Sequence, residues 1–196
     1  MWVGVSLDSF YNQIELSKIG FNSVGKNVLI SKKCSIYNPE NITIGDNVRI
    51  DDFCILSGKI CLGNYIHIAA SSVLFGGIEG IIIKDYSCLS SRCAIYAITD
   101  DYSGNYMTNP MVPDKFRNVV YKEVIIGKHV VIGSGSTVLP GVHIADGVSI
   151  GSMTLVNKDL NEIAIYVGVP AKKLKDRSRN IFNLENKLLN ELEKNK

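Results

Sequence analysis

Residues 126–156 read IGKHVVIGSGSTVLPGVHIADGVSIGSMTLV, and this stretch decides the fold. Every sixth residue in it is aliphatic: Ile126, Ile132, Val138, Ile144, Ile150 and Val156. A period of six matches neither a helix face nor the alternation of an ordinary strand. It is typical of a solenoid in which short parallel strands wind into coils, a hexapeptide-repeat solenoid. Unrelated strands of a β-sandwich would not keep one register over six hexads, so we favour the solenoid.

The same period continues toward the N-terminus in three further registers. They comprise Ile44, Ile50, Leu56, Leu62, Ile68 and Leu74; Ile83, Leu89 and Ile95; and Val24, Ile30 and Ile36. The spacing lengthens by two residues between Ile36 and Ile44 and by three between Leu74 and Ile83, which predicts a small bulged corner at residues 75–80. Three hexads close one triangular coil, so we expect each residue to stack on the one eighteen positions later.

The rest of the chain divides around this repeat. We expect an all-β fold with three parts: a helical segment at 1–22, where Ser9 can cap a short helix, a β-helix at 23–170, and a C-terminal helix at 171–196. A loop at 98–122 interrupts the repeat and concentrates acids, aromatics and amides. Long aperiodic loops in compact domains often carry function, so we predict that this loop does. The alternative is a surface excursion that packs on a neighbouring subunit.

Composition narrows the possible partners. The net charge of +2 gives no electrostatic reason to expect nucleic acid or an anionic membrane as a partner. No apolar run is long enough to cross a membrane, and residues 1–5 lack the basic start of a signal peptide, so we expect no membrane insertion and a cytoplasmic location. The five cysteines show no metal-ligand spacing. We interpret them as reduced packing thiols and expect no metal site.

The hexads, the long loop and the closing residues Tyr166-Val167-Gly168-Val169-Pro170-Ala171-Lys172-Lys173 together resemble the hexapeptide-repeat acyltransferases that use acetyl-CoA. The resemblance covers residues 10–180, although Val169 replaces the Asn usual in the closing signature. It implies a left-handed parallel β-helix, a homotrimer, and three active sites between adjacent subunits. The left hand is an exception to the general rule for crossovers, and the resemblance alone supplies it.

Many members of this family carry a catalytic His in the long loop, but here the matching stretch is Ile98-Thr99-Asp100-Asp101. The chain therefore looks closer to a branch that acetylates the amino group of a nucleotide-linked amino sugar, such as dTDP-4-amino-4,6-dideoxyglucose, for bacterial surface polysaccharides including lipopolysaccharide O-antigen. The resemblance implies acetyl-CoA as the acyl donor. Two alternatives stay open, a sugar or polysaccharide O-acetyltransferase and a non-catalytic solenoid scaffold. A metal hydratase of the same architecture would need three His ligands, and the three His of this chain are too dispersed for that.

Five residues are candidates for catalysis. Asp100 and Asp101 could orient the ammonium of an amino sugar and accept its proton, or they could only shape a turn. Ser90 and Ser91 lie one hexad before the loop and could bond the amine or a sugar hydroxyl, or could be solvated. We expect His67 to line a cleft between subunits, and His129 to sit at a solvated corner.

The expected CoA site uses the last regular coils. Small residues there, Gly133 with Ser134 and Gly151 with Ser152, would let the pantetheine arm approach the backbone. Lys158, and Lys172 or Lys173 after Pro170, could bind the phosphates of CoA as cationic donors. Solvated lysines are the alternative for each.

Overall fold

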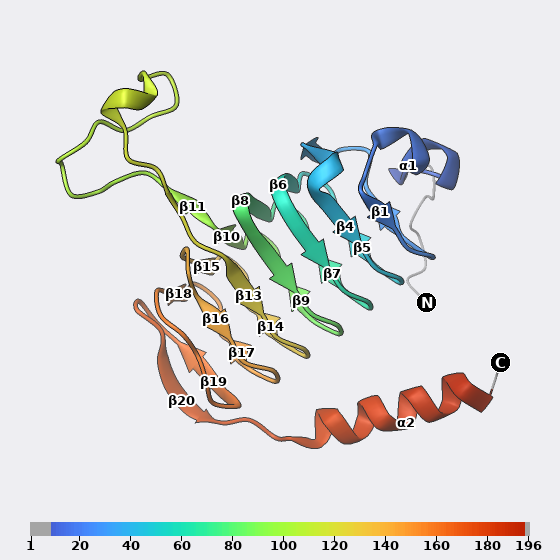
Figure 1. Cartoon of the computed structure of the whole chain (residues 1–196). Coiled ribbons are helices and arrows are strands. Elements are labelled where there is room, and N and C mark those ends of the chain that lie inside the picture. Colours follow the sequence, from blue (N-terminus) through green and yellow to red (C-terminus); the bar gives the residue numbers. More distant parts are fainter. Residues whose placement is uncertain (1–8, 195–196) are drawn as a thin grey trace.

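The body of the molecule is a parallel β-solenoid with three faces, seen in a computed structural model that describes residues 9–194 (Figure 1). The first face contains β1 (Ser23–Val24), β4 (Ile42–Ile44), the ends of β6 (Ile55–Leu62) and β8 (Val73–Ile83), β13 (Val124–Ile126) and β16 (His143–Ile144). The second contains β2 (Leu29–Ile30), β5 (Arg49–Ile50), β7 (His67–Ile68), β9 (Cys88–Leu89), β14 (Val131–Ile132), β17 (Ser149–Ile150) and β19 (Ala164–Val167). The third contains β3 (Ser35–Tyr37), the starts of β6 and β8, β10 (Ala94–Tyr96), β15 (Thr137–Val138) and β18 (Leu155–Val156).

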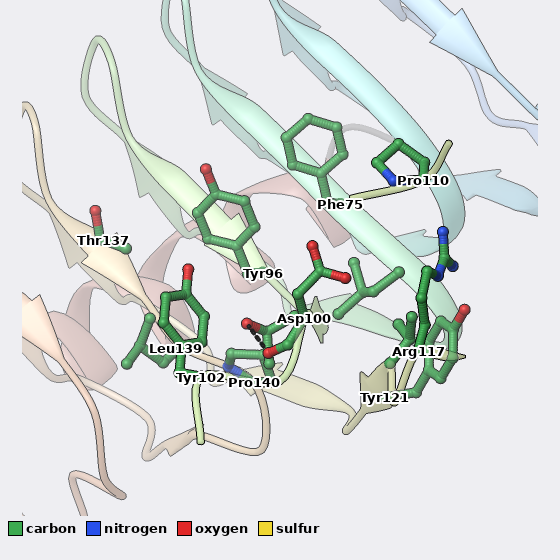
Figure 2. Close-up of a pocket in the computed structure, with 13 residues that line it drawn as sticks. Phe75, Tyr96, Asp100, Tyr102, Pro110, Arg117, Tyr121, Thr137, Leu139 and Pro140 are labelled. Atoms are coloured by element: carbon green, nitrogen blue, oxygen red, sulfur yellow. Dashed lines mark hydrogen bonds between the residues drawn. The ribbon is translucent and has the colours of Figure 1, made fainter. Parts of the chain in front are cut away.

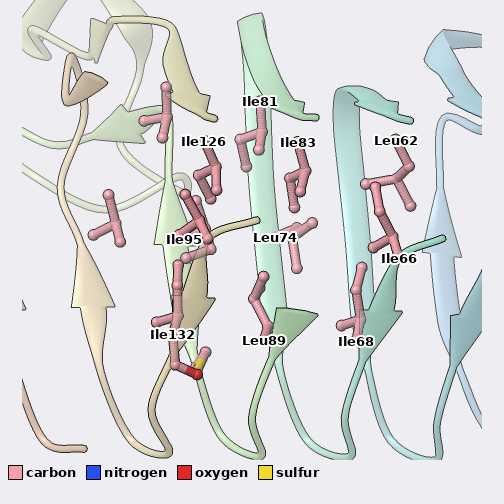
Figure 3. Close-up of a cluster of buried hydrophobic side chains, with 14 of the residues drawn as sticks. Leu62, Ile66, Ile68, Leu74, Ile81, Ile83, Leu89, Ile95, Ile126 and Ile132 are labelled. Carbon is pink, nitrogen blue, oxygen red and sulfur yellow. The ribbon is translucent and has the colours of Figure 1, made fainter. Parts of the chain in front are cut away.

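The register of these strands confirms the predicted solenoid. Ile126 pairs with Ile144, and Ile132 with Ile150, each eighteen positions apart. Where the sequence spacing lengthens by three residues, the distance in sequence between paired residues also lengthens by three. Leu74 pairs with Ile95, twenty-one positions on, because residues 76–80 form a bulged corner. The aliphatic residue of each hexad is buried, so leucines and isoleucines stack through successive coils as ladders (Figure 3). Burial of these ladders is the main apolar contribution to stability.

The edge between the first and second faces is built from residues with positive φ. Tyr65, Tyr86 and His129 occupy it in successive coils, with φ of 56°, 61° and 56°. Their rings stack at 5.1 Å and 5.0 Å between centroids. Residues other than glycine seldom adopt a positive φ, because this backbone conformation costs free energy. Stacking of the three rings offsets part of that cost. We call these three residues the aromatic corner.

Short helices close the N-terminal end. Asn12 and Glu15 form a capping box for α1 (Gln13–Ile19), so the cap is Asn12 rather than the predicted Ser9. Leu16 packs into the core from this helix. A 3-10 turn, η2 (Pro39–Asn41), lies between β3 and β4. Residues 1–8 of the predicted helical segment lie outside the described residues.

The C-terminal segment differs from its prediction. Residues 172–176, expected to be helical, form β20 (Lys172–Asp176), which pairs antiparallel with β19. The edge of β19 offers unpaired backbone groups, and pairing outweighs the charged composition of this strand. The helix α2 begins later, at Asn180, and ends at Lys194. Among the described residues, no helix is long and apolar enough to cross a membrane.

The predicted loop projects from the solenoid as an arm, defined here as residues 98–121 (Figure 1). Its base is a two-stranded antiparallel ribbon of β11 (Ile98–Thr99) and β12 (Val120–Tyr121), and its outer part contains the 3-10 turn η3 (Asp114–Phe116). The backbone N–H of Lys122 donates to the Ala97 carbonyl at 2.9 Å. The arm therefore leaves and rejoins the coils at one point.

Candidate active site

A pocket of about 800 Å³ opens where the arm meets the third face (Figure 2). Phe75, Tyr96, Thr137, Leu139 and Pro140 belong to the solenoid side of its lining. The arm contributes Ile98, Thr99, Asp100, Tyr102, Pro110, Arg117, Val119 and Tyr121. Most of this lining is apolar or aromatic, and two of its residues carry charge. Such a composition is usual for small-molecule sites.

Two stacked rings form the solenoid side of the pocket. Phe75 and Tyr96 are register partners on β8 and β10, so both side chains point to the same side of the sheet. Their centroids lie 5.5 Å apart with an interplanar angle of 14°. They present a flat apolar surface against which a ring-shaped ligand can pack.

The two adjacent acids of the arm have different surroundings. Asp100 lines the pocket, and within residues 9–194 its carboxylate accepts one hydrogen bond, a long one of 3.4 Å from the Asn109 N–H. Asp101 instead accepts bonds from the Ser103 N–H at 2.7 Å and from the Asn118 amide at 3.1 Å. The bonds from Ser103, and then that from Asn118, lower the pKa of Asp101. Asp101 therefore shapes a turn, while Asp100 is open to a ligand.

Arg117 is the cationic residue of the pocket. Its side chain is 15% exposed, and Nη1 donates to the Asn109 carbonyl at 3.1 Å. Nη2 lies 3.4 Å from Asp114, whose side chain is 96% exposed. Nε is buried and has no hydrogen-bond partner among the described residues. Figure 2 shows Asp100 between Arg117 on one side and Tyr102 and Leu139 on the other.

The serines and glycines predicted to belong to the site lie together on another edge of the solenoid, where the second face turns into the third. Ser90 N–H donates to the Ile132 carbonyl, and Gly133 N–H to the Ile150 carbonyl, both at 2.8 Å, so these corners stack in successive coils. A Cβ on Gly133 would lie 2.4 Å from the Ser152 nitrogen, so the stacking requires glycine there. We call this stripe the small-residue edge; it consists of Ser90, Ser91, Gly133, Ser134, Gly151 and Ser152.

The small-residue edge and the pocket lie at opposite ends of the third face. The strands β10 and β11 separate Ser90 from Asp100 along the chain. These strands contain five residues, with a bend at Ala97 between them. Asp100 lines the pocket, whereas Ser90 does not.

His67 lies on the second face rather than in the pocket. Its Nε2 is 2.7 Å from one carboxylate oxygen of Asp51, and Arg49 Nε is 2.7 Å from the other. Register pairing of β5 with β7 places Arg49 directly beside His67. The imidazole is 47% exposed, so this pair is accessible from outside the chain.

The predicted basic residues at the end of the solenoid are not equivalent. Lys173 is held between Glu162 and Asp176, and these two carboxylates raise the pKa of its ammonium, that of Asp176 most. Lys158 and Lys172 are exposed, and no ion pair involves them within residues 9–194. Pro170 is exposed in the turn between β19 and β20. Lys158 and Lys172 are therefore the more available cations.

Comparison with known proteins places this geometry in a family. Residues 119–158 match the family model described as bacterial transferase hexapeptide (six repeats). The chain is 46% identical over 180 residues to dTDP-4-amino-4,6-dideoxy-D-glucose acyltransferase of Escherichia coli. The aligned residues cover 90% of this chain and 93% of the relative. The chain belongs to this family of hexapeptide-repeat acyltransferases.

Two other proteins are similar to this acyltransferase. AntD, an N-acyltransferase from Bacillus cereus, is 54% identical with a TM-score of 0.92, over 93% of this chain and 98% of AntD, and was solved with dTDP-4-amino-4,6-dideoxyglucose and coenzyme A. WbbJ of Escherichia coli K12, named as a candidate O-acetyl transferase of lipopolysaccharide biosynthesis, is 32% identical over 79% of this chain and 76% of its own length.

Sequence reasoning missed several pocket residues of this acyltransferase. Phe75 and Tyr96 each follow an aliphatic hexad residue and stand twenty-one positions apart, so the register could have paired them. Arg117 lies in the aperiodic arm, where no repeat assigns a position to a side chain. Within residues 9–194, no group of three His, Cys, Asp or Glu side chains is arranged to hold a metal ion.

Proposed function

We propose that the protein transfers an acyl group from a coenzyme A thioester to the amino group of a dTDP-linked 4-amino-4,6-dideoxy sugar. The observation that carries the proposal is Asp100, an open carboxylate in an aromatic pocket on an arm that holds no histidine. A carboxylate attracts an ammonium group, and aromatic faces pack against sugar rings. The Escherichia coli relative is named for this sugar, and AntD binds it together with coenzyme A.

The chemistry follows from the groups present. Asp100 orients the ammonium of the sugar and accepts or relays one proton, so that the neutral amine attacks the thioester carbonyl. A C–N bond forms, the C–S bond breaks, and the departing thiolate takes a proton to become the free thiol. An ammonium and a thioester thus yield an amide, coenzyme A and one proton. An amine needs less help from a base than a hydroxyl does, in keeping with an arm that has no histidine.

The site is completed by a second copy of the chain in this proposal. Structures of AntD include variants of a serine and of an aspartate that lie ten positions apart in its sequence. Ser90 and Asp100 are also ten positions apart, yet they stand at opposite ends of the third face. A homotrimer would set the small-residue edge of one subunit against the pocket of the next, with the pantetheine arm along that edge.

The donor and the setting complete the proposal. Acetyl-CoA is the expected donor, and AntD was also solved with 3-hydroxybutyryl-CoA, so both thioesters belong in the assay. Lys158 and Lys172 would meet the phosphates of the donor. The enzyme would act in the cytoplasm on a nucleotide sugar destined for surface polysaccharide such as O-antigen.

The test is release of free thiol from acetyl-CoA or 3-hydroxybutyryl-CoA in the presence of dTDP-4-amino-4,6-dideoxyglucose, with dTDP-glucose as the hydroxyl control. We expect turnover with the amino sugar and little with dTDP-glucose. Turnover confined to hydroxyl acceptors would refute N-acylation.

O-acetylation is the second candidate, favoured by the similarity to WbbJ and by the His67–Asp51 pair, which has the composition of a general base with its orienting carboxylate. In that case a His67→Asn variant loses activity toward a sugar hydroxyl. If the amine mechanism holds, His67→Asn stays close to the parent enzyme.

A further inference from the structure

Two opposite charges share the pocket without pairing. Asp100 and Arg117 are its charged lining residues, and no ion pair joins them. Asp100 has one long hydrogen bond, and Arg117 faces a neutral carbonyl and an exposed carboxylate. Charges held apart in one apolar pocket suit a ligand that carries a cation and an anion at a fixed separation.

Arg117 has unused capacity for an anion. Its buried Nε donor lacks a partner among the described residues, although buried donors are almost always satisfied. The guanidinium is planar and binds phosphate oxygens through parallel N–H groups. Its position is also fixed, because Nη1 is anchored to the Asn109 carbonyl. A phosphate oxygen at Nη2 would replace the exposed Asp114 as the anionic partner.

We propose that Arg117 binds the diphosphate of the acceptor and thereby sets the direction in which the acceptor enters the pocket. This inference rests on the proposed function, which supplies an acceptor with a diphosphate at one end and an ammonium at the other. Arg117 takes the diphosphate, and Asp100 takes the ammonium beyond it. Figure 2 shows Leu139 and Thr137 past Asp100, on the coils that lead to β18. The acyl donor would then meet the ammonium at the end of the acceptor opposite the nucleotide.

The same guanidinium could in principle meet the phosphates of coenzyme A, so the test separates the two sources. The full-length protein and its Arg117→Met and Arg117→Lys variants are titrated with dTDP, thymidine and coenzyme A. Lys115→Met is the matched control, because Lys115 lies on the same arm but stacks on Phe116 and does not line the pocket.

We expect Arg117→Met to weaken dTDP binding about 10- to 100-fold, the range for hydrogen bonds to charged groups. Thymidine and coenzyme A binding should stay unchanged, as should all three in Lys115→Met. Arg117→Lys should fall between the parent and Arg117→Met. In turnover assays, Arg117→Met should raise KM for the nucleotide sugar more than it lowers kcat.

Three results would overturn the inference. Unchanged dTDP affinity in Arg117→Met shows that the guanidinium does not meet the diphosphate. An equal loss for thymidine and dTDP assigns Arg117 to the folding of the arm, and a loss confined to coenzyme A assigns it to the donor. A parent protein that binds no dTDP removes the proposed function as well, whereas the other results leave that function standing.

Discussion

Neighbouring residues of one type take different roles in this molecule because the backbone presents them to different surroundings. Asp100 enters the pocket, while Asp101 turns back to bond Ser103 and Asn118. The sequence placed two acids in the arm and left open which one served a turn. Two partners decide it: Ser103, two residues on, and Asn118, seventeen residues further along an aperiodic segment. The contact with Ser103 is local, but no repeat in the loop predicts the contact with Asn118.

The first prediction separates these two acids. Asp100→Asn should lower kcat for the amino sugar by about 10²- to 10⁴-fold, the usual contribution of a positioned acid–base group. Asp101→Asn is the control, because an amide oxygen can still accept the bonds from Ser103. Initial rates of thiol release measure both. Similar losses in the two variants would contradict the assignment of Asp100 as the group that meets the amine.

The second prediction concerns the adjacent lysines Lys172 and Lys173. Lys173 is occupied by Glu162 and Asp176, whereas Lys172 is exposed and without an ion pair in the described part of the chain. Lys172→Met should raise KM for the acyl-CoA about 3- to 5-fold, as expected for an exposed charge pair, and the effect should shrink at high salt. Lys173→Met should change KM less. The reverse order would show that the acyl-CoA displaces the carboxylates from Lys173.

At the scale of elements, the solenoid was predictable and the docking of its C-terminal helix was not. The hexad register needs only local spacing, and it located even the lengthened corner at residues 76–80. The position of α2 depends on contacts between residues more than fifty positions apart. His129 was expected to be solvated, but the expectation was wrong: its imidazole is 11% exposed, meets the edge of Phe182, and lies 2.7 Å from Glu185.

These contacts explain how α2 is held, since none of its residues is buried. Glu185 bonds His129 with one oxygen and Lys128, at 3.0 Å, with the other. The last residue of the aromatic corner, His129, thus contacts Phe182 edge-on, and the ion pair of Lys128 with Glu185 lies beside it. Arg177, just before the helix, donates to the His129 carbonyl at 2.9 Å and to the Gly147 carbonyl at 3.0 Å. The helix therefore depends on a few polar contacts rather than on a broad apolar face.

The third prediction follows from the charge on Glu185. His129, and then Lys128, hold the pKa of this carboxyl below its ordinary value of 4.5. Because the folded pKa is lowered, the stabilisation is present above about pH 4.5 and is lost as pH falls through the folded pKa. Glu185→Gln should cost about 1 kcal/mol of unfolding free energy at pH 7 and less at pH 3.

Urea unfolding at the two pH values measures this difference. Glu193→Gln, an exposed change on the last turn of the same helix, is the control and should match the parent at both pH values. If Glu185→Gln lowers the unfolding free energy as much at pH 3 as at pH 7, the shape of the Glu185 side chain rather than its charge holds the helix.

At the scale of the whole molecule, the pocket and the small-residue edge lie apart on one chain. The pocket and the small-residue edge were both anticipated as site elements, but their separation across the third face was not. Sequence spacing counts residues along the coil and cannot tell which coil corners meet between copies. A second subunit, turned about an axis, can bring the edge of one chain to the pocket of another.

The fourth prediction tests this arrangement by mixing subunits. Ser90→Ala and Asp100→Asn enzymes should each be impaired alone. Mixed trimers of the two variants should recover about a third of the parent activity, because each mixed trimer contains one intact site among its three interfaces. Activity is measured after co-expression and purification through two different tags. The mixed trimers are verified by light scattering. If their activity is no greater than the summed activities of the two variants alone, Ser90 of one subunit and Asp100 of the next do not share a site.

The single point at which the arm joins the coils has a consequence for how such enzymes diverge. Ile83 pairs with Ile126, forty-three positions on, in the same geometry that joins Ile126 to Ile144. The coils thus stack in the same way whether or not a segment is inserted between them, as it is between Ala97 and Lys122. Doubling the length of a flexible insertion adds only about 0.6 kcal/mol of closure entropy. The arm can therefore be lengthened or exchanged as a unit, while the stacked coils on either side of it stay constant.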